Sequence, residues 1–153
     1  MTPPPPFDVA AGHRHFAPAC FNRAWQLLDK PDRTSAENDE LLLAAMAAAW
    51  HWSQREDCRP RNLAVGFWQI SRVHAILANG MEARRFAARS ALHATDEPPF
   101  YMAYAHEALA RAGRALGDED AAARHLAEAR HLMTKVTDPE EHAMLAADLA
   151  TLF

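Results

Sequence analysis

The sequence predicts an all-α fold, and three observations support this prediction. Alanine, the strongest helix former, makes up about a fifth of the chain. Apolar residues recur at intervals of three and four residues, which is the period of a helix with one buried face. No segment alternates Val, Ile or Thr with polar residues as a strand would. We therefore expect about seven helices, joined by short turns and so antiparallel to their neighbours.

The first two helices follow a proline-rich start. Residues 1–12 contain four consecutive prolines and predict a flexible tail in polyproline II conformation. The first helix is expected over residues 15–28, before Lys30-Pro31 stops it. A capping-box pattern, Thr34 with Glu37, opens a second helix that continues to about residue 55. Apolar residues cover a wide arc of the second helix, so we expect it to be central.

The other helices are placed by their first and last residues. Pro60 suits the first turn of the third helix, and Asn79-Gly80 predicts its left-handed end. The fourth follows over residues 81–94. The fifth helix begins at Asp96 and Pro98 and ends at Gly117. The sixth begins at Asp118, and the seventh begins at Asp138 with Pro139 and Glu141.

Residues 101–132 carry the clearest structural pattern. They predict two helices folded back on each other, with Leu109-Ala110 at the crossing, Gly117 at the turn, and a small–large–small series in the second helix: Ala122, Leu126, Ala129. This unit resembles a tetratricopeptide repeat (TPR). A second helix–Gly–helix unit around Gly80 matches only in part. The resemblance implies antiparallel α–α hairpins in a right-handed superhelix and a binding role, and it transfers no site residues.

Four further strings resemble a family of small uncharacterised bacterial helical proteins. They are WHWSQ (50–54), NLAVGFWQISRVHAIL (62–77), AYAHEALARA (103–112) and ADLATL (147–152). This resemblance implies a bacterial helical protein and carries no assigned activity.

Composition and charge exclude several classes of protein. The formal net charge of −4 gives no attraction to nucleic acids or anionic membranes. There is no signal-peptide pattern and no apolar run long enough to cross a bilayer. Cys20 and Cys58 form no CxxC pair, which favours reduced thiols. We expect a cytoplasmic protein that binds neither nucleic acid nor membrane.

No sequence motif predicts catalysis or metal binding. The nine histidines include no HExxH pair and no repeated Glu-x-x-His spacing. There is no glycine-rich phosphate loop and no GxSxG. We therefore expect no catalytic residues, no metal site, no cofactor and no enzymatic activity.

A cluster of polar residues in the middle helices supplies the candidate site. An Arg72–Glu107 ion pair, flanked by Trp52 and Trp68, could line a pocket for a polar ligand or could be a buried pair that fixes helix register. The other members of the cluster are His51, Gln69, His74 and Tyr104.

Trp50 and Trp52 add a hint of an interface. They lie about 200° apart on a helix, so both cannot face inward. One of them should meet a second layer, a dimer partner or solvent, and exposed tryptophan is favoured at binding hot spots.

The sequence favours a single TPR-like domain over residues 13–153 that binds a protein or peptide, or forms a homodimer. Its concave surface is expected on the second, third and fifth helices. The alternative is a small-molecule or metal site in the bundle, using His51, Arg72, His74 and Glu107, with possible enzymatic activity. The candidate binding residues are Trp50, His51, Trp52, Gln69, Arg72, His74, Tyr104 and Glu107.

Overall fold

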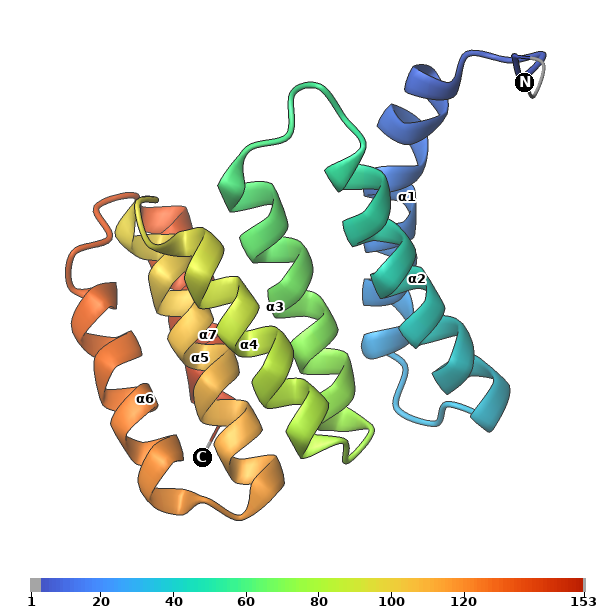
Figure 1. Cartoon of the computed structure of the whole chain (residues 1–153). Helices are drawn as coiled ribbons and strands as arrows, with labels where there is room; N and C mark the ends of the chain where they lie inside the picture. Colours follow the sequence, from blue (N-terminus) through green and yellow to red (C-terminus); the bar gives the residue numbers. More distant parts are fainter. Residues whose placement is uncertain (1–3, 153) are drawn as a thin grey trace.

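The computed structural model describes residues 4–152, and within them every regular element is helical (Figure 1). The all-α prediction is confirmed, and this part of the chain contains seven helices. They are α1 (Val9–Leu28), α2 (Ser35–Ser53), α3 (Pro60–Ile76), α4 (Gly80–Ala94), α5 (Pro99–Leu116), α6 (Glu119–Met133) and α7 (Pro139–Ala150).

The helices form three antiparallel hairpins, α1–α2, α3–α4 and α5–α6, followed by the single helix α7. Consecutive hairpins pack side by side, and α7 packs against α5 and α6. The central helices are α3, which contacts α2, α4 and α5, and α5, which contacts α3, α4, α6 and α7. The expectation that α2 is central is wrong, because α2 packs mainly against α1 and α3 and leaves Leu43, Met46 and Trp50 exposed.

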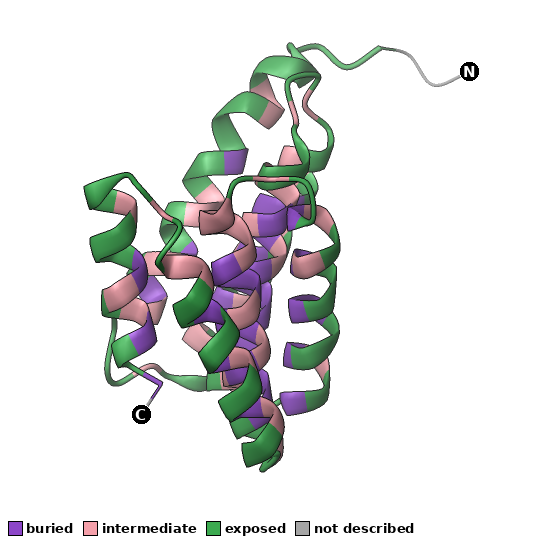
Figure 2. Ribbon diagram, turned by 90° about the vertical axis from the view of Figure 1, so that its left-hand side faces the viewer, coloured by how far each residue is buried: buried purple, intermediate pink, exposed green. Residues whose placement is uncertain are grey.

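The hydrophobic core divides into two main clusters along the row of helices. One lies between α1, α2, α3 and α4 and includes Leu27, Leu41 and Ile70. The other lies between α3, α5, α6 and α7 and includes Trp68, Tyr104, Leu126, Leu145 and Leu149. Figure 2 shows the buried positions on the inward sides of the helices and the exposed positions on their outer sides.

Most predicted helix ends are confirmed by cap geometry. The Thr34–Glu37 capping box is formed, the side chains of Asp118 and Asp138 accept backbone N–H groups of the next turn, and Gly117 has a positive φ of 72°. These bonds satisfy N–H groups that a helix start leaves without partners.

Two predicted ends are wrong. α1 begins at Val9, because the Asp8 side chain accepts from the Ala11 N–H, so residues 9–12 are helical and the proline-rich tail ends earlier. Between α3 and α4 the left-handed residue is Ala78 (φ 62°), and Gly80 is the first residue of α4. Gly80 is required there for a close approach, since a Cβ would lie 2.8 Å from Leu116 Cγ.

Within residues 4–152, no helix combines the length and the apolar character needed to cross a lipid bilayer.

Candidate functional site

A cavity of about 550 Å³ lies between α1, α3, α5 and α7. We call it the aromatic groove. It opens to solvent, since Met144 at its edge is 57% exposed and several of its aromatic rings are only half-buried. Its walls are Phe21 and Trp25 of α1, Ala64, Val65 and Trp68 of α3, Ser90 of α4, Phe100, Tyr101 and Tyr104 of α5, and Met144, Ala147 and Asp148 of α7.

The first helix of each hairpin and α7 therefore form the hollow side of the molecule. Of the second, third and fifth helices, on which the concave surface was expected, α3 and α5 line the groove and α2 does not. The reason is that α2 lies on the far side of α1 and α3, and no α2 residue lines the groove.

Aromatic rings form a continuous wall along the groove. The ring centroids of Trp25 and Trp68 are 5.6 Å apart, and those of Trp68 and Tyr104 are 4.9 Å apart. Phe100 continues the wall, with its centroid 5.0 Å from Tyr104 and 5.4 Å from Tyr101. Such edge-to-face and tilted contacts hold each ring in place, so the apolar surface is largely pre-formed.

A network of paired charges lies beneath this wall. The Trp68 indole Nε1 donates to Glu107 Oε2 over 2.7 Å, and Arg111 donates to Glu107 Oε1 through Nε at 2.8 Å. Arg72 Nη1 donates to Asp148 Oδ1 at 2.9 Å. The two guanidinium groups therefore balance the charges of the two carboxylates. The Glu107 carboxylate is fully buried.

Tyr104 connects the network to the groove. Its hydroxyl donates to Asp148 Oδ2 over 2.7 Å. Burial, and then the hydrogen bond to Asp148, raise the pKa of Tyr104 well above its ordinary value, so the phenol remains neutral and continues to donate.

The structure brings together three of the predicted site residues, Arg72, Tyr104 and Glu107. The predicted Arg72–Glu107 ion pair is present but long, with 4.0 Å between Nη1 and Oε1. Its flanking rings are Trp25 and Trp68, whose centroids lie 5.3 and 5.8 Å from the Arg72 guanidinium carbon. Trp52 does not flank this pair, so that expectation is wrong.

The sequence prediction did not include the stronger partners of this pair, Arg111 and Asp148. Arg111 follows Glu107 by four residues on one helix, a spacing that predicts an ion pair. Asp148 is a carboxylate among the buried residues Leu145, Leu149 and Leu152. A charged residue within such an apolar series could have identified it as a site residue. Trp25 comes from α1, and no sequence spacing connects it to the site.

Gln69 and His74 lie in the core, away from the groove. The Gln69 Nε2 donates to the backbone oxygen of Phe21 over 3.1 Å, and its Oε1 has no partner in the described chain. His74 stacks on Phe86 with 5.6 Å between ring centroids, and burial lowers its pKa. These two residues hold α3 against α1 and α4.

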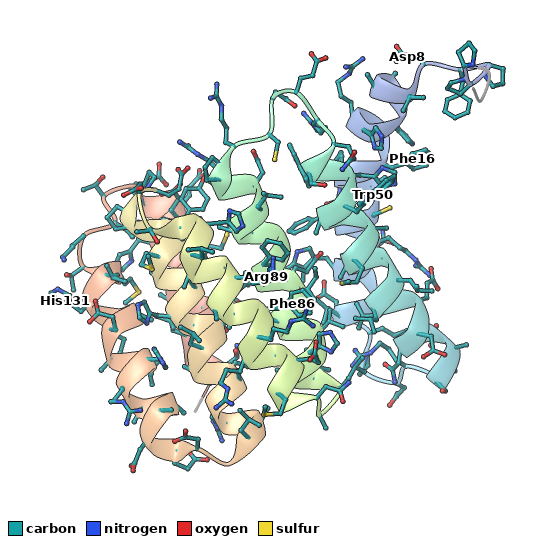
Figure 3. The ribbon with its side chains drawn as sticks, viewed as in Figure 1. Asp8, Phe16, Trp50, Phe86, Arg89 and His131 are labelled. Atoms are coloured by element: carbon teal, nitrogen blue, oxygen red, sulfur yellow. The ribbon has the colours of Figure 1, made fainter. Side chains whose placement is uncertain are left out.

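Trp50, His51 and Trp52 lie at the end of the α1–α2 hairpin. His51 Nδ1 is 2.8 Å from Nδ1 of His13, which belongs to α1. Figure 3 shows Trp50 near Phe16 on this hairpin, and both rings contact His51. Trp52 lies under the Arg55 guanidinium and lines a smaller hollow of about 180 Å³ beside the groove.

A second histidine pair joins α5 to α6, with 3.0 Å between the Nδ1 atoms of His106 and His125. Across residues 4–152, no three His, Cys, Asp or Glu side chains come together in a group that could hold a metal ion.

These features define an all-α protein of antiparallel helical hairpins with an aromatic groove on one side. No protein-family model, no curated protein and no solved structure matches the chain.

Proposed function

We propose that this protein is a TPR-like binding module whose aromatic groove holds an apolar segment of a partner peptide. The observation that carries the proposal is the pre-formed wall of rings around a cavity of about 550 Å³. Pockets of roughly 300–1,000 Å³ suit ligands or side chains of this size. Aromatic residues also dominate the energetics of peptide and protein interfaces.

The charge network supports a binding role rather than a catalytic one. A general base needs a carboxylate that is free to take a proton from a substrate. Glu107 accepts from Trp68 and Arg111, and Asp148 accepts from Arg72 and Tyr104. Because these groups satisfy one another, what the groove offers a ligand is chiefly apolar surface. The pairing favours the scaffold hypothesis over the enzymatic alternative.

The test is selection of peptides from a display library on the immobilised full chain. We expect Met144→Arg to weaken the selected peptides about tenfold or more, because it puts a charge at the mouth of an apolar groove. Met81→Arg is the matched control, since Met81 is 62% exposed and lies on α4, outside the groove. Peptides that bind both variants equally well, or a library that yields no binders, would contradict the proposal.

A second candidate function is self-association through the outer face of α2. Leu43, Met46 and Trp50 form one stripe of this helix, and all three are exposed, Leu43 at 70% and Trp50 at 56%. Contiguous exposed apolar residues of this kind mark interaction surfaces. Sedimentation of the Leu43→Glu variant tests it: the variant should lose the part of the association that uses this face, and an unchanged association constant would exclude the face.

A further inference from the structure

Two side chains of the aromatic groove carry hydrogen-bond donors that have no partner among the described residues. The side chains of Trp25 and Tyr101 line the groove, and neither the Trp25 indole N–H nor the Tyr101 hydroxyl has a hydrogen-bond partner among the described residues. The other polar groups are engaged: Trp68 with Glu107, and Tyr104 with Asp148, whose charge Arg72 also balances. An apolar ligand that carries hydrogen-bond acceptors would therefore satisfy both of these donors.

A proline-rich segment has these properties. Proline has no backbone N–H, and in polyproline II conformation the backbone carbonyls have no internal partners. Such segments bind in aromatic-lined grooves, where prolines pack on rings and carbonyls accept from side-chain donors. Their restricted backbone also loses little conformational entropy on binding.

The chain itself carries such a segment. Four prolines at positions 3–6 precede Phe7, and Pro4, Pro5 and Pro6 are exposed where the structure describes them. Phe7 is 66% exposed, which gives the segment an apolar side chain that could fill the cavity. The segment leads away from the helices (Figure 1).

On the basis of the proposed function, we propose that the aromatic groove binds residues 4–7 of a second copy of this chain. The groove of the same copy is out of reach, because four residues of polyproline II span about 12 Å. Along α1, Asp8 and the groove residue Phe21 are separated by about 20 Å of helix. The Asp8 side chain caps α1, so this separation is kept while the helix is intact.

Fluorescence anisotropy of a dye-labelled peptide with the sequence of residues 2–9 tests the ligand class. The receptor is the full chain carrying Pro4→Ala, Pro5→Ala and Pro6→Ala, so that its own segment does not compete. We expect the proline peptide to bind about tenfold more tightly than a peptide with alanine in place of its prolines. Met144→Arg in the receptor should abolish binding, and Met81→Arg should not.

Tyr101→Phe refines this test, because it removes one donor and keeps the ring. It should weaken the proline peptide about two- to tenfold, the usual effect of losing one hydrogen bond. Leu92→Ala, an exposed apolar site on α4, should leave binding unchanged.

The outcomes separate the inference from the proposed function. Equal binding of the proline and alanine peptides overturns the inference and leaves the proposed function intact. The same holds if neither binds while library-selected peptides still depend on Met144. If no peptide of any kind binds, both are overturned.

Sedimentation tests the second-copy assignment. In the Leu43→Glu background, in which the α2 face cannot contribute, we expect association that rises with concentration and is lost on replacing Pro4, Pro5 and Pro6 by alanine. A chain that stays monomeric at high concentration, or association that survives the proline substitutions, would overturn the assignment.

Discussion

Glu107 shows how a single buried residue organises the interior beside the groove. It is fully buried, yet its two oxygens accept from the Trp68 indole and the Arg111 guanidinium. A buried carboxylate is tolerated only when it is paired and hydrogen-bonded. The hydrogen bond to Glu107 therefore fixes the indole ring of Trp68, which forms part of the groove wall.

We predict that Glu107→Gln lowers the free energy of unfolding by about 2–4 kcal/mol, because it leaves buried positive charge without its partner. The measurement is urea denaturation followed by circular dichroism. Glu82→Gln is the control, since Glu82 pairs with Arg85 on the surface of α4 and such pairs contribute about 0–1 kcal/mol. Equal losses in the two variants would contradict the structural role given to Glu107.

The His106–His125 pair makes stability depend on pH. Burial lowers the pKa of both histidines, and the charge of His125 lowers that of His106 further, against smaller opposite effects of Glu128 and Asp118. As the pH falls through the ordinary histidine value near 6.5, the unfolded chain therefore takes up protons before the folded one. Stability should fall from about pH 7 to about pH 5.

His106→Asn should flatten this pH dependence, measured as the change in unfolding free energy between the two pH values. His131→Asn is the control, because His131 is exposed on α6 (Figure 3) and belongs to no such pair. A slope that is the same in both variants would exclude the pair as its source.

At the scale of the helices, the crossing of α5 and α6 depends on small residues. A Cβ on Gly113 would lie 2.9 Å from the backbone nitrogen and 3.2 Å from the Cα of Ala122. A backbone atom cannot move aside as a flexible side chain can, so the two helices would have to separate.

We predict that Gly113→Ala destabilises the protein by about 1–3 kcal/mol, as overpacked sites do. Gly12→Ala is the matched substitution, because Gly12 lies inside α1 with no atom within 4 Å of its added Cβ. There alanine should stabilise the helix by about 0.5–1 kcal/mol. The midpoints of thermal unfolding should move in opposite directions; a shift in the same direction would contradict the packing described for Gly113.

Helix existence and most helix ends were predictable, because caps and turns depend on neighbouring residues. Thr34, Asp118 and Gly117 act as their types predict. The turn between α3 and α4 was not predictable, because Ala78 takes the left-handed conformation at a cost of about 1 kcal/mol. Gly80 instead packs closely against Leu116 of α5, where a Cβ would clash. This need for a glycine comes from a distant helix, so the residues next to Gly80 do not predict it.

At the scale of the whole molecule, the site was predictable only in part. Of the predicted residues only Tyr104 lines the groove, whereas Arg72 and Glu107 belong to the charge network beneath it. The three were chosen because they are polar residues among apolar ones. Trp25 and Asp148 were not, because they come from α1 and α7 and meet α3 and α5 only in the folded chain. The groove is a product of the way the four helices pack, so no single segment of the sequence encodes it.

The proposed binding site is tested most directly by the indole N–H signals of the four tryptophans in a nuclear magnetic resonance titration of the full chain with a selected peptide. The Trp25 indole lines the groove without a partner in the described chain, whereas Trp50 lies on the exposed stripe of α2. We predict that the Trp25 signal shifts and saturates as peptide is added while the Trp50 signal stays in place. A shift of Trp50 with Trp25 unchanged, or no shift of either signal by a peptide that binds, would contradict it.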